Sequence, residues 1–162
     1  MSQEEQFLKE IRRQRIAQIR QLPDQIETLV KDLTVEQLTT HFLADEWTVA
    51  QNVHHLVDSH MNSYIRCKLM ATEDQPPLKP YDQDAWAMHA DATTAEIQNS
   101  LIMLRALHVR WAQFWESLPD SAWSRTGMRP TAGPISLNDQ LGLYVEHGLA
   151  HIDQIERTLE AQ

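Results

Sequence analysis

The amino-acid sequence predicts an all-α protein, a bundle of four long helices. Three observations support this fold class. Apolar residues recur every three or four positions along four long segments, which is the period of a helix buried on one face. The 162-residue chain has only four glycines, and it is rich in residues that favour helix. No segment shows the alternation of apolar and polar residues that is typical of a strand.

The first two long helices are separated by a short connection. The first should cover about residues 3–32, with Pro23 either kinking it or starting a new helical segment. Residues 34–37 look like a capping box that opens one short turn of helix. The second long helix should start at Thr48, a good N-cap residue, and run to about Ala71.

The second half of the chain contains two long loops. Residues 75–84 include three prolines, so we expect an ordered crossover loop between the second and third helices, with a turn of helix near 82–86. The third helix should open at a capping box in residues 93–96 and end before a second loop, about residues 119–135. Ser136 should then cap the fourth helix, which runs nearly to the C-terminus.

Composition narrows the classes of function. The length suits a single domain, residues 1–162, with a real core. A net charge of −9 repels phosphate backbones, so we expect no nucleic-acid partner. No apolar run approaches the ~20 residues of a membrane span, and the N-terminus shows no signal stretch, so no membrane is expected. Cys67 is the single cysteine, which suits a reducing cytoplasm and a buried, inert thiol.

Two histidines in the fourth helix suggest a metal site. His147 and His151 are four residues apart, so they share one helix face and can point at the same spot. They flank the apolar stripe beside Tyr144 and should therefore face a neighbouring helix. A third imidazole from that helix would complete a three-nitrogen site with positions open for water or substrate. The pair alone is a weak signal, because half-buried histidines satisfied by hydrogen bonds give the same pattern.

The helical wheel does not select the third histidine. In the second helix, His60 falls inside the apolar stripe and His54 lies at its edge. His55 shares a polar stripe with other side chains, namely Asn52, Ser59, Asn62 and Arg66. Taken alone, that stripe looks like a solvated surface, so periodicity favours His60 or His54. Three other histidines have no spacing that links them to the site, namely His41, His89 and His108.

A family resemblance does select the third histidine. The segment from Trp47 to Arg66, the proline-rich loop and the closing motif of residues 147–152 resemble the DinB/YfiT-like superfamily, and most closely its YfiT branch. That branch is described as metal-dependent hydrolases related to bacillithiol S-transferases. The resemblance covers about residues 20–155. It implies a four-helix bundle with a long crossover, and an open pocket at one end where the metal ligands are His55, His147 and His151.

The same resemblance implies where a substrate would bind. If the fold holds, the polar stripe turns inward, and Arg66 becomes the best candidate to hold an anionic group. Weaker candidates are Ser59, Asn62, Tyr81 and Trp86, the last two either as a roof over the pocket or as a cover for the core. Glu146 and Asp58 point away from the ligands on their helices, so no side chain is assigned as general base.

Departures from the family pattern concern the pocket more than the ligands. Asn52 stands where the family usually has an apolar residue. Leu143 and Tyr144 occupy positions where the family often has an extra tryptophan and histidine. These differences affect the expected pocket shape and substrate.

Three neutral imidazoles would leave a bound cation its full charge, which lowers the pKa of a bound water or thiol. Zn²⁺ and Ni²⁺ suit such ligands best, and Fe²⁺ or Mn²⁺ would also be accepted. A low-molecular-weight thiol is a candidate second cofactor. We therefore expect a cytoplasmic homodimer that acts on a small-molecule substrate as a metal-dependent hydrolase or thiol S-transferase. Two alternatives stay open: a non-catalytic, metal-binding dimeric stress or interaction protein, and a structural bundle whose histidines bind nothing.

Overall fold

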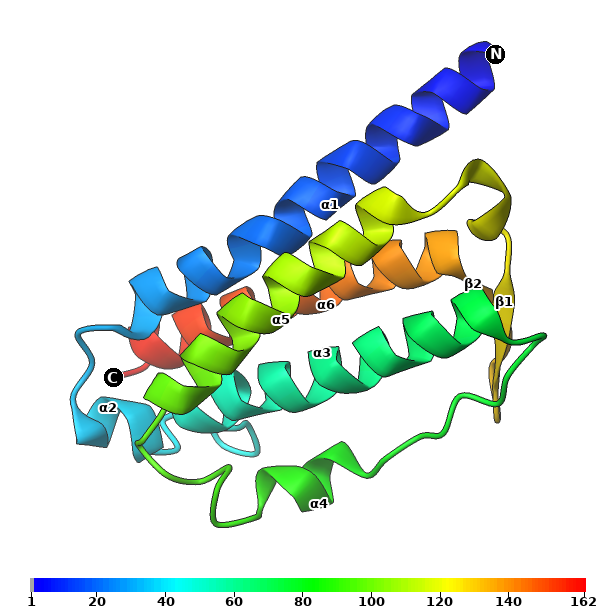
Figure 1. Cartoon of the computed structure of the whole chain (residues 1–162). Helices are drawn as coiled ribbons and strands as arrows, with labels where there is room; N and C mark the ends of the chain where they lie inside the picture. Colours follow the sequence, from blue (N-terminus) through cyan, green and yellow to red (C-terminus); the bar gives the residue numbers. More distant parts are fainter. Residues whose placement is uncertain (1) are drawn as a thin grey trace.

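The computed structural model describes residues 2–162, and Met1 lies outside that range. The described residues form six α-helices, one 3-10 turn and one two-stranded sheet (Figure 1). The elements are α1 (Gln3–Val30), α2 (Val35–Thr39), α3 (Val49–Thr72), α4 (Gln83–Ala87), α5 (Gln98–Ser117), η1 (Asp120–Ala122), β1 (Thr126–Arg129), β2 (Gly133–Ser136) and α6 (Leu137–Glu160). The four long helices α1, α3, α5 and α6 form the bundle, which confirms the predicted fold class.

Local capping signals place most helix starts where the sequence predicts them. The Thr34 and Thr48 side chains each accept a hydrogen bond from the backbone N–H three residues later, and both are capping boxes. The Ser136 hydroxyl accepts a hydrogen bond from the Asp139 backbone N–H and opens α6. Asp82 caps the short helix α4 inside the crossover segment. Each of these starts depends on residues three positions apart, so the sequence alone reveals them.

The predicted start of the third long helix is wrong. The helix α5 begins at Gln98, and its N-cap residue Ile97 makes no capping hydrogen bond through a side chain. The Thr94 carbonyl oxygen instead lies 3.0 Å from His54 Nε2. The Thr94 hydroxyl accepts a hydrogen bond from the Glu96 N–H. A contact with α3 therefore holds the residues of the predicted capping box in a turn outside the helix.

The predicted loop of residues 119–135 is also wrong in part, because it contains strands. β1 and β2 pair in antiparallel register, with Thr126 opposite Ser136 and Arg129 opposite Gly133. Gly133 has a φ of +72°, a conformation that glycine adopts without strain at this turn. The crossover segment pairs with β1, since the Leu78 N–H donates to the Met128 carbonyl at 2.8 Å. Strands of four residues are too short to show a period in the sequence.

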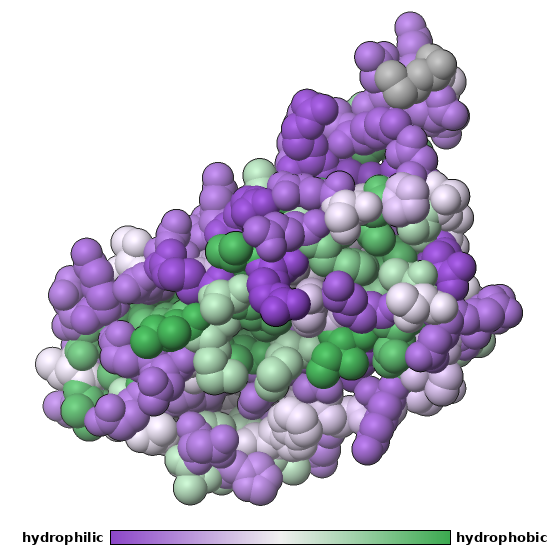
Figure 2. Space-filling model, in the orientation of Figure 1, coloured by the Kyte–Doolittle hydropathy of each residue, from purple (hydrophilic) through white to green (hydrophobic). Residues whose placement is uncertain are grey.

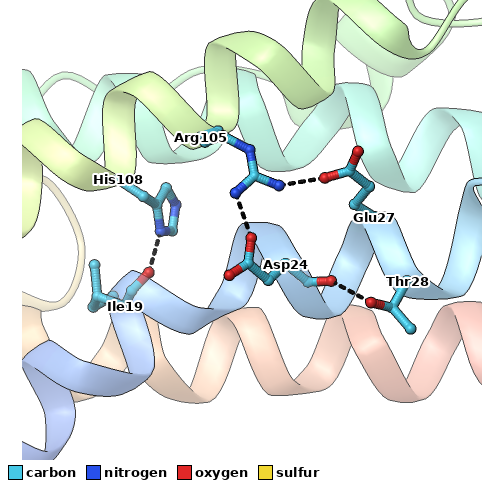
Figure 3. Close-up of polar contacts among 6 residues, drawn as sticks. All are labelled: Ile19, Asp24, Glu27, Thr28, Arg105 and His108. Atoms are coloured by element: carbon cyan, nitrogen blue, oxygen red, sulfur yellow. Dashed lines mark hydrogen bonds and ion pairs between the residues drawn. The ribbon is translucent and has the colours of Figure 1, made fainter.

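The helices pack around two clusters of buried apolar side chains. Trp111 and Trp115 belong to one cluster and Leu104 to the other, and all three are fully buried. Arg105 of α5 forms ion pairs with Asp24 and Glu27 of α1 at the surface of the bundle (Figure 3). The first turns of α1 extend beyond the bundle (Figure 1), and their surface is mainly hydrophilic (Figure 2). Among residues 2–162, no helix has the length and apolar character needed to cross a bilayer.

The approach of α1 to α6 depends on a glycine between two of the histidines of interest. A Cβ atom at Gly148 would lie 2.8 Å from the Leu22 side chain of α1. We expect Gly148→Val to lower the free energy of unfolding by about 1–3 kcal/mol, since the added atoms overpack this contact. Urea denaturation would measure the change. Leu149→Val, at the half-exposed neighbouring position, should cost under about 0.5 kcal/mol. Equal effects of the two substitutions would contradict the packing argument.

Candidate metal centre

His55 of α3 and the pair His147 and His151 of α6 lie together inside the bundle. Their nearest ring nitrogens all fall within 4.8 Å of one another, so the three form a cluster that could hold a metal ion. His147 Nε2 is 3.4 Å from His55 Nε2 and 3.2 Å from His151 Nε2. Two nitrogens bound to one tetrahedral zinc at about 2.0–2.1 Å would be roughly 3.3–3.4 Å apart. The two short separations in the cluster therefore suit ligands of a single cation.

Asn52 fixes the orientation of the His151 ring. The His151 Nδ1 atom lies 2.7 Å from Asn52 Oδ1. The Asn52 amide nitrogen donates to the Thr48 carbonyl at 3.0 Å, which leaves Oδ1 as the atom that faces the ring. An amide oxygen only accepts, so the proton of a neutral His151 is on Nδ1 and its Nε2 carries a bare lone pair. This lone pair is directed toward the other two histidines.

Burial keeps the three imidazoles of the cluster in the form that binds metal. It lowers the pKa of His55 to about 3, together with repulsion from the nearby His151. It lowers the pKa of His147 to about 3, with added repulsion from His151 and His55. Burial also lowers the pKa of His151 to about 4. At neutral pH the cluster is therefore a set of uncharged nitrogen donors, and within residues 2–162 it includes no carboxylate.

Trp47 packs over two members of the cluster. Its ring centroid is 4.7 Å from that of His55 and 6.3 Å from that of His151, with which it is stacked. Trp47 precedes the Thr48 cap of α3, so the start of that helix holds the indole in place. The indole restricts access of water to the histidines from this side.

A second group of histidines lies directly behind the cluster. His60 Nε2 is 3.0 Å from His147 Nδ1, and His60 Nδ1 is 2.7 Å from His108 Nε2. Both His60 and His108 are fully buried. Spacing in the sequence gives His108 no link to the site, and helix packing supplies one through His60. His54 lies elsewhere, bonded to Ser100 and to the Thr94 carbonyl.

The candidate substrate residues hold the crossover segment against α3. Arg66 donates to the Lys79 carbonyl and lies over the Tyr81 ring, which in turn packs against Trp86 with ring centroids 4.5 Å apart. Burial raises the pKa of Tyr81, and the nearby Ser59 opposes that shift. Arg66 follows His55 by eleven residues, or about 16 Å along the helix axis. The contacts that the structure gives Arg66 are with the crossover segment.

Two further candidates lie nearer the cluster along α3. Ser59 is buried, and its carbonyl lies 3.4 Å from the Tyr144 hydroxyl. The Asn62 side chain donates to the Asp58 carbonyl at 2.8 Å, within its own helix. A role in substrate binding stays a prediction for all five residues, namely Ser59, Asn62, Arg66, Tyr81 and Trp86.

Comparison with known proteins agrees with this architecture. A family model described as the DinB superfamily matches residues 18–155. The chain belongs to the DinB superfamily. Among its relatives is the "Putative metal-dependent hydrolase YfiT" of Bacillus subtilis, which is 40% identical over 159 residues, 96% of this chain and 89% of the relative. A relative from Oceanobacillus iheyensis with the same description is 42% identical over 140 residues, 86% of this chain and 81% of the relative.

Solved structures show the same fold. The structure of YfiT from Bacillus subtilis, described as a probable metal-dependent hydrolase with an unusual four-helix bundle topology, superposes with a TM-score of 0.89 at 39% identity. That match covers 98% of this chain and 87% of the YfiT chain. A mycothiol-dependent maleylpyruvate isomerase matches with a TM-score of 0.70 at 14% identity, over 89% of this chain and 60% of the isomerase. At that identity the second likeness concerns the fold alone.

Proposed function

We propose that this DinB-superfamily protein is a metal-dependent enzyme that binds one divalent transition-metal ion through His55, His147 and His151. The observation that carries the proposal is the convergence of three uncharged imidazoles, two of them buried and His147 half-buried, with His151 Nε2 held free of a proton by Asn52. Converging lone pairs repel one another, and a shared cation removes that repulsion. Zinc and nickel suit three nitrogen ligands best, and iron or manganese would also fit. The relatives described as metal-dependent hydrolases support the same assignment.

The reaction that fits this site is attack by an activated water or thiol on a small electrophile, as in a hydrolase or a thiol S-transferase. A bound cation would lower the pKa of the attacking water or thiol and stabilise its anion. The protein residues hold the donors in place, with Asn52 orienting His151 and Trp47 limiting access of water. Glu146 is exposed, and burial raises the pKa of Asp58, which interacts with Asp91 and His54 instead. Neither residue is in position to serve as general base.

Metal-loaded protein should consume one of two probe substrates. We expect turnover either of p-nitrophenyl acetate or of 1-chloro-2,4-dinitrobenzene in the presence of a small thiol, both followed by absorbance. Loss of a ligand should cost more than the 10–100-fold typical of residues that orient ligands, so His55→Ala should reduce the rate by more than about 100-fold.

The matched control is His54→Ala, which removes the neighbouring buried histidine of α3 without touching the cluster. It should keep both bound metal and turnover. Retained metal without turnover on either probe would favour the non-catalytic alternative, and failure to retain any transition metal after reloading would favour the structural one. The homodimer, the cytoplasmic location and the absence of nucleic-acid partners stay predictions.

A further inference from the structure

The proposed metal site is connected to a proline in α1 through a chain of hydrogen bonds. Pro23 lies inside α1 and has no N–H to donate to the Ile19 carbonyl, its partner four residues earlier in the helix. His108 of α5 takes that place, with Nδ1 2.5 Å from the Ile19 oxygen (Figure 3). A carbonyl oxygen only accepts, so His108 carries a proton on Nδ1.

This first bond determines the direction of the next two. His60 and His108 are both fully enclosed by the bundle, where a charged imidazole would be costly, and a neutral imidazole has one N–H and one bare nitrogen. His108 Nε2 is therefore bare and accepts from His60 Nδ1 at 2.7 Å. His60 Nε2 is then bare in turn and accepts from His147 Nδ1 at 3.0 Å. Reversing any bond in the chain would leave two N–H groups, or two lone pairs, facing each other in a buried site.

We infer that His60 and His108 are positioning residues that fix His147 as its Nδ1–H tautomer and direct a bare Nε2 toward the metal. Isolated histidine prefers its proton on Nε2, so this tautomer has to be imposed by the protein. The inference rests on the proposed function, because His147 is assigned there as a ligand. Neither His60 nor His108 touches the metal or the substrate in this scheme. They act through His147 alone.

The hydrogen bonds that lead from Ile19 to His147 do for His147 what Asn52 does for His151. Two separate partners, Asn52 and His60, hold the Nδ1 protons of His151 and His147, so that both Nε2 atoms are bare at a separation of 3.2 Å. Their lone pairs repel each other in the metal-free protein. Both rings are packed between the helices and held at Nδ1, so neither ring can turn away without breaking a hydrogen bond. The fold therefore orders part of the ligand set before a cation binds.

A purely structural role for the two histidines makes different predictions. Suppose that the hydrogen bonds from Ile19 to His147 only satisfied buried polar groups. Their direction would then not matter to the cluster, and their loss would lower the stability of the fold while leaving its affinity for metal unchanged. The tautomer of His147 and the affinity for zinc are the two properties that separate these roles.

The first test needs no variant. In metal-free protein labelled with ¹⁵N-histidine, long-range ¹H–¹⁵N spectra distinguish a protonated from a bare ring nitrogen. We expect His147, His60 and His108 all to be Nδ1–H tautomers at neutral pH. Finding the proton of His147 on Nε2 would overturn the inference, whether or not the protein proves to bind metal.

The second test compares three variants for zinc affinity, measured by competition with a chromophoric chelator. His108→Phe removes the acceptor for His60 and should weaken zinc binding about 10- to 100-fold, whereas His108→Gln restores an acceptor and should stay within about threefold of wild type. His54→Phe is the matched control, since it removes a buried histidine with two hydrogen bonds away from the site, and it should bind zinc as wild type does.

The two tests keep this inference separate from the proposed function. Wild-type binding of zinc with equal affinity in His108→Phe and His54→Phe would overturn the positioning role and leave the metal site intact. Absence of zinc binding by wild type would contradict the proposed function, and the tautomer spectrum would then decide the direction of the chain. If His108→Phe does not fold, the tautomer spectrum of wild type still decides the positioning role.

Discussion

Replacing His147 with alanine should abolish tight metal binding. His147 is the central member of the cluster, because its Nε2 is the atom from which the 3.4 Å and 3.2 Å separations to His55 and His151 are both measured. Binding energies of about 10–16 kcal/mol for structural zinc sites imply several kcal/mol per ligand, so we expect zinc affinity to fall about 100- to 1,000-fold. Competition with a chelator would measure the affinity, and elemental analysis the amount of metal retained.

Stability provides an independent measure of the same change. A ligand that binds only the folded state stabilises it by about 2.7 kcal/mol at 100 times its dissociation constant. Zinc should therefore raise the melting temperature of wild type and of His54→Ala, and leave that of His147→Ala unchanged. The substitution also leaves His60 Nε2 without its partner, which costs about 1–3 kcal/mol, so circular dichroism has to confirm that the variant is folded. A folded His147→Ala protein that retained one equivalent of zinc with wild-type affinity would remove His147 from the site.

Much of the fold can be predicted from the sequence because the signals are local. The caps at Thr34, Thr48 and Ser136 depend on hydrogen bonds between residues three positions apart. The start of α5 and the hairpin of residues 126–136 could not be predicted in the same way. Both depend on partners far away in the chain, namely His54 for Thr94 and the crossover segment for Met128.

The candidate site, like the fold, could be predicted from the sequence only where the signal is local. The spacing of His147 and His151 predicts one shared helix face, but the helical wheel of α3 favours His60 over His55. The wheel assumes that one face of a helix meets solvent. In α3, every residue from Val49 to Val57 is buried, because α5, α6 and the shorter helices α2 and α4 surround its first half. A polar side chain such as His55 is therefore enclosed, and a family resemblance was needed to select it.

The partners of the ligands were harder to predict than the ligands. Asn52 was visible only as a departure from the family pattern, and the structure shows that it orients His151. His60 and His108 lie on two different helices, and the contact between them depends on how α3 and α5 pack. The spacing of residues within one helix carries no information about such a contact.

Acid should destabilise the metal-free protein well above the pH at which its carboxylates titrate. Burial lowers the pKa of His55 and His147 to about 3 and of His108 and His151 to about 4, and it lowers the pKa of His60 as well. In the unfolded chain these histidines titrate near about 6.5. As the pH falls below that value the unfolded state takes up protons that the folded state does not, so the free energy of unfolding falls with pH.

The expected loss is large because several histidines act together. Each one contributes about 1.4 kcal/mol per pH unit below its unfolded pKa, so the five together should remove on the order of 10 kcal/mol by pH 5, which is comparable to a typical total of about 5–15 kcal/mol. Asp58 acts in the opposite direction, since its raised pKa favours the folded state as the pH falls, but it is one group against five. Urea denaturation of chelator-treated protein at intervals from pH 7.5 to pH 5 would measure the slope.

A single substitution checks that the buried histidines cause this slope. His108→Gln replaces one of them with a side chain that does not titrate, so the slope near pH 5.5 should decrease by about 1.4 kcal/mol per pH unit. His89→Gln, at an exposed position, should leave the slope as in wild type. A free energy of unfolding that stays constant between pH 7.5 and pH 5 would mean that the buried imidazoles take up protons as readily as those of the unfolded chain. The cluster would then be too open to water to hold its nitrogens in the uncharged form that a metal ion requires.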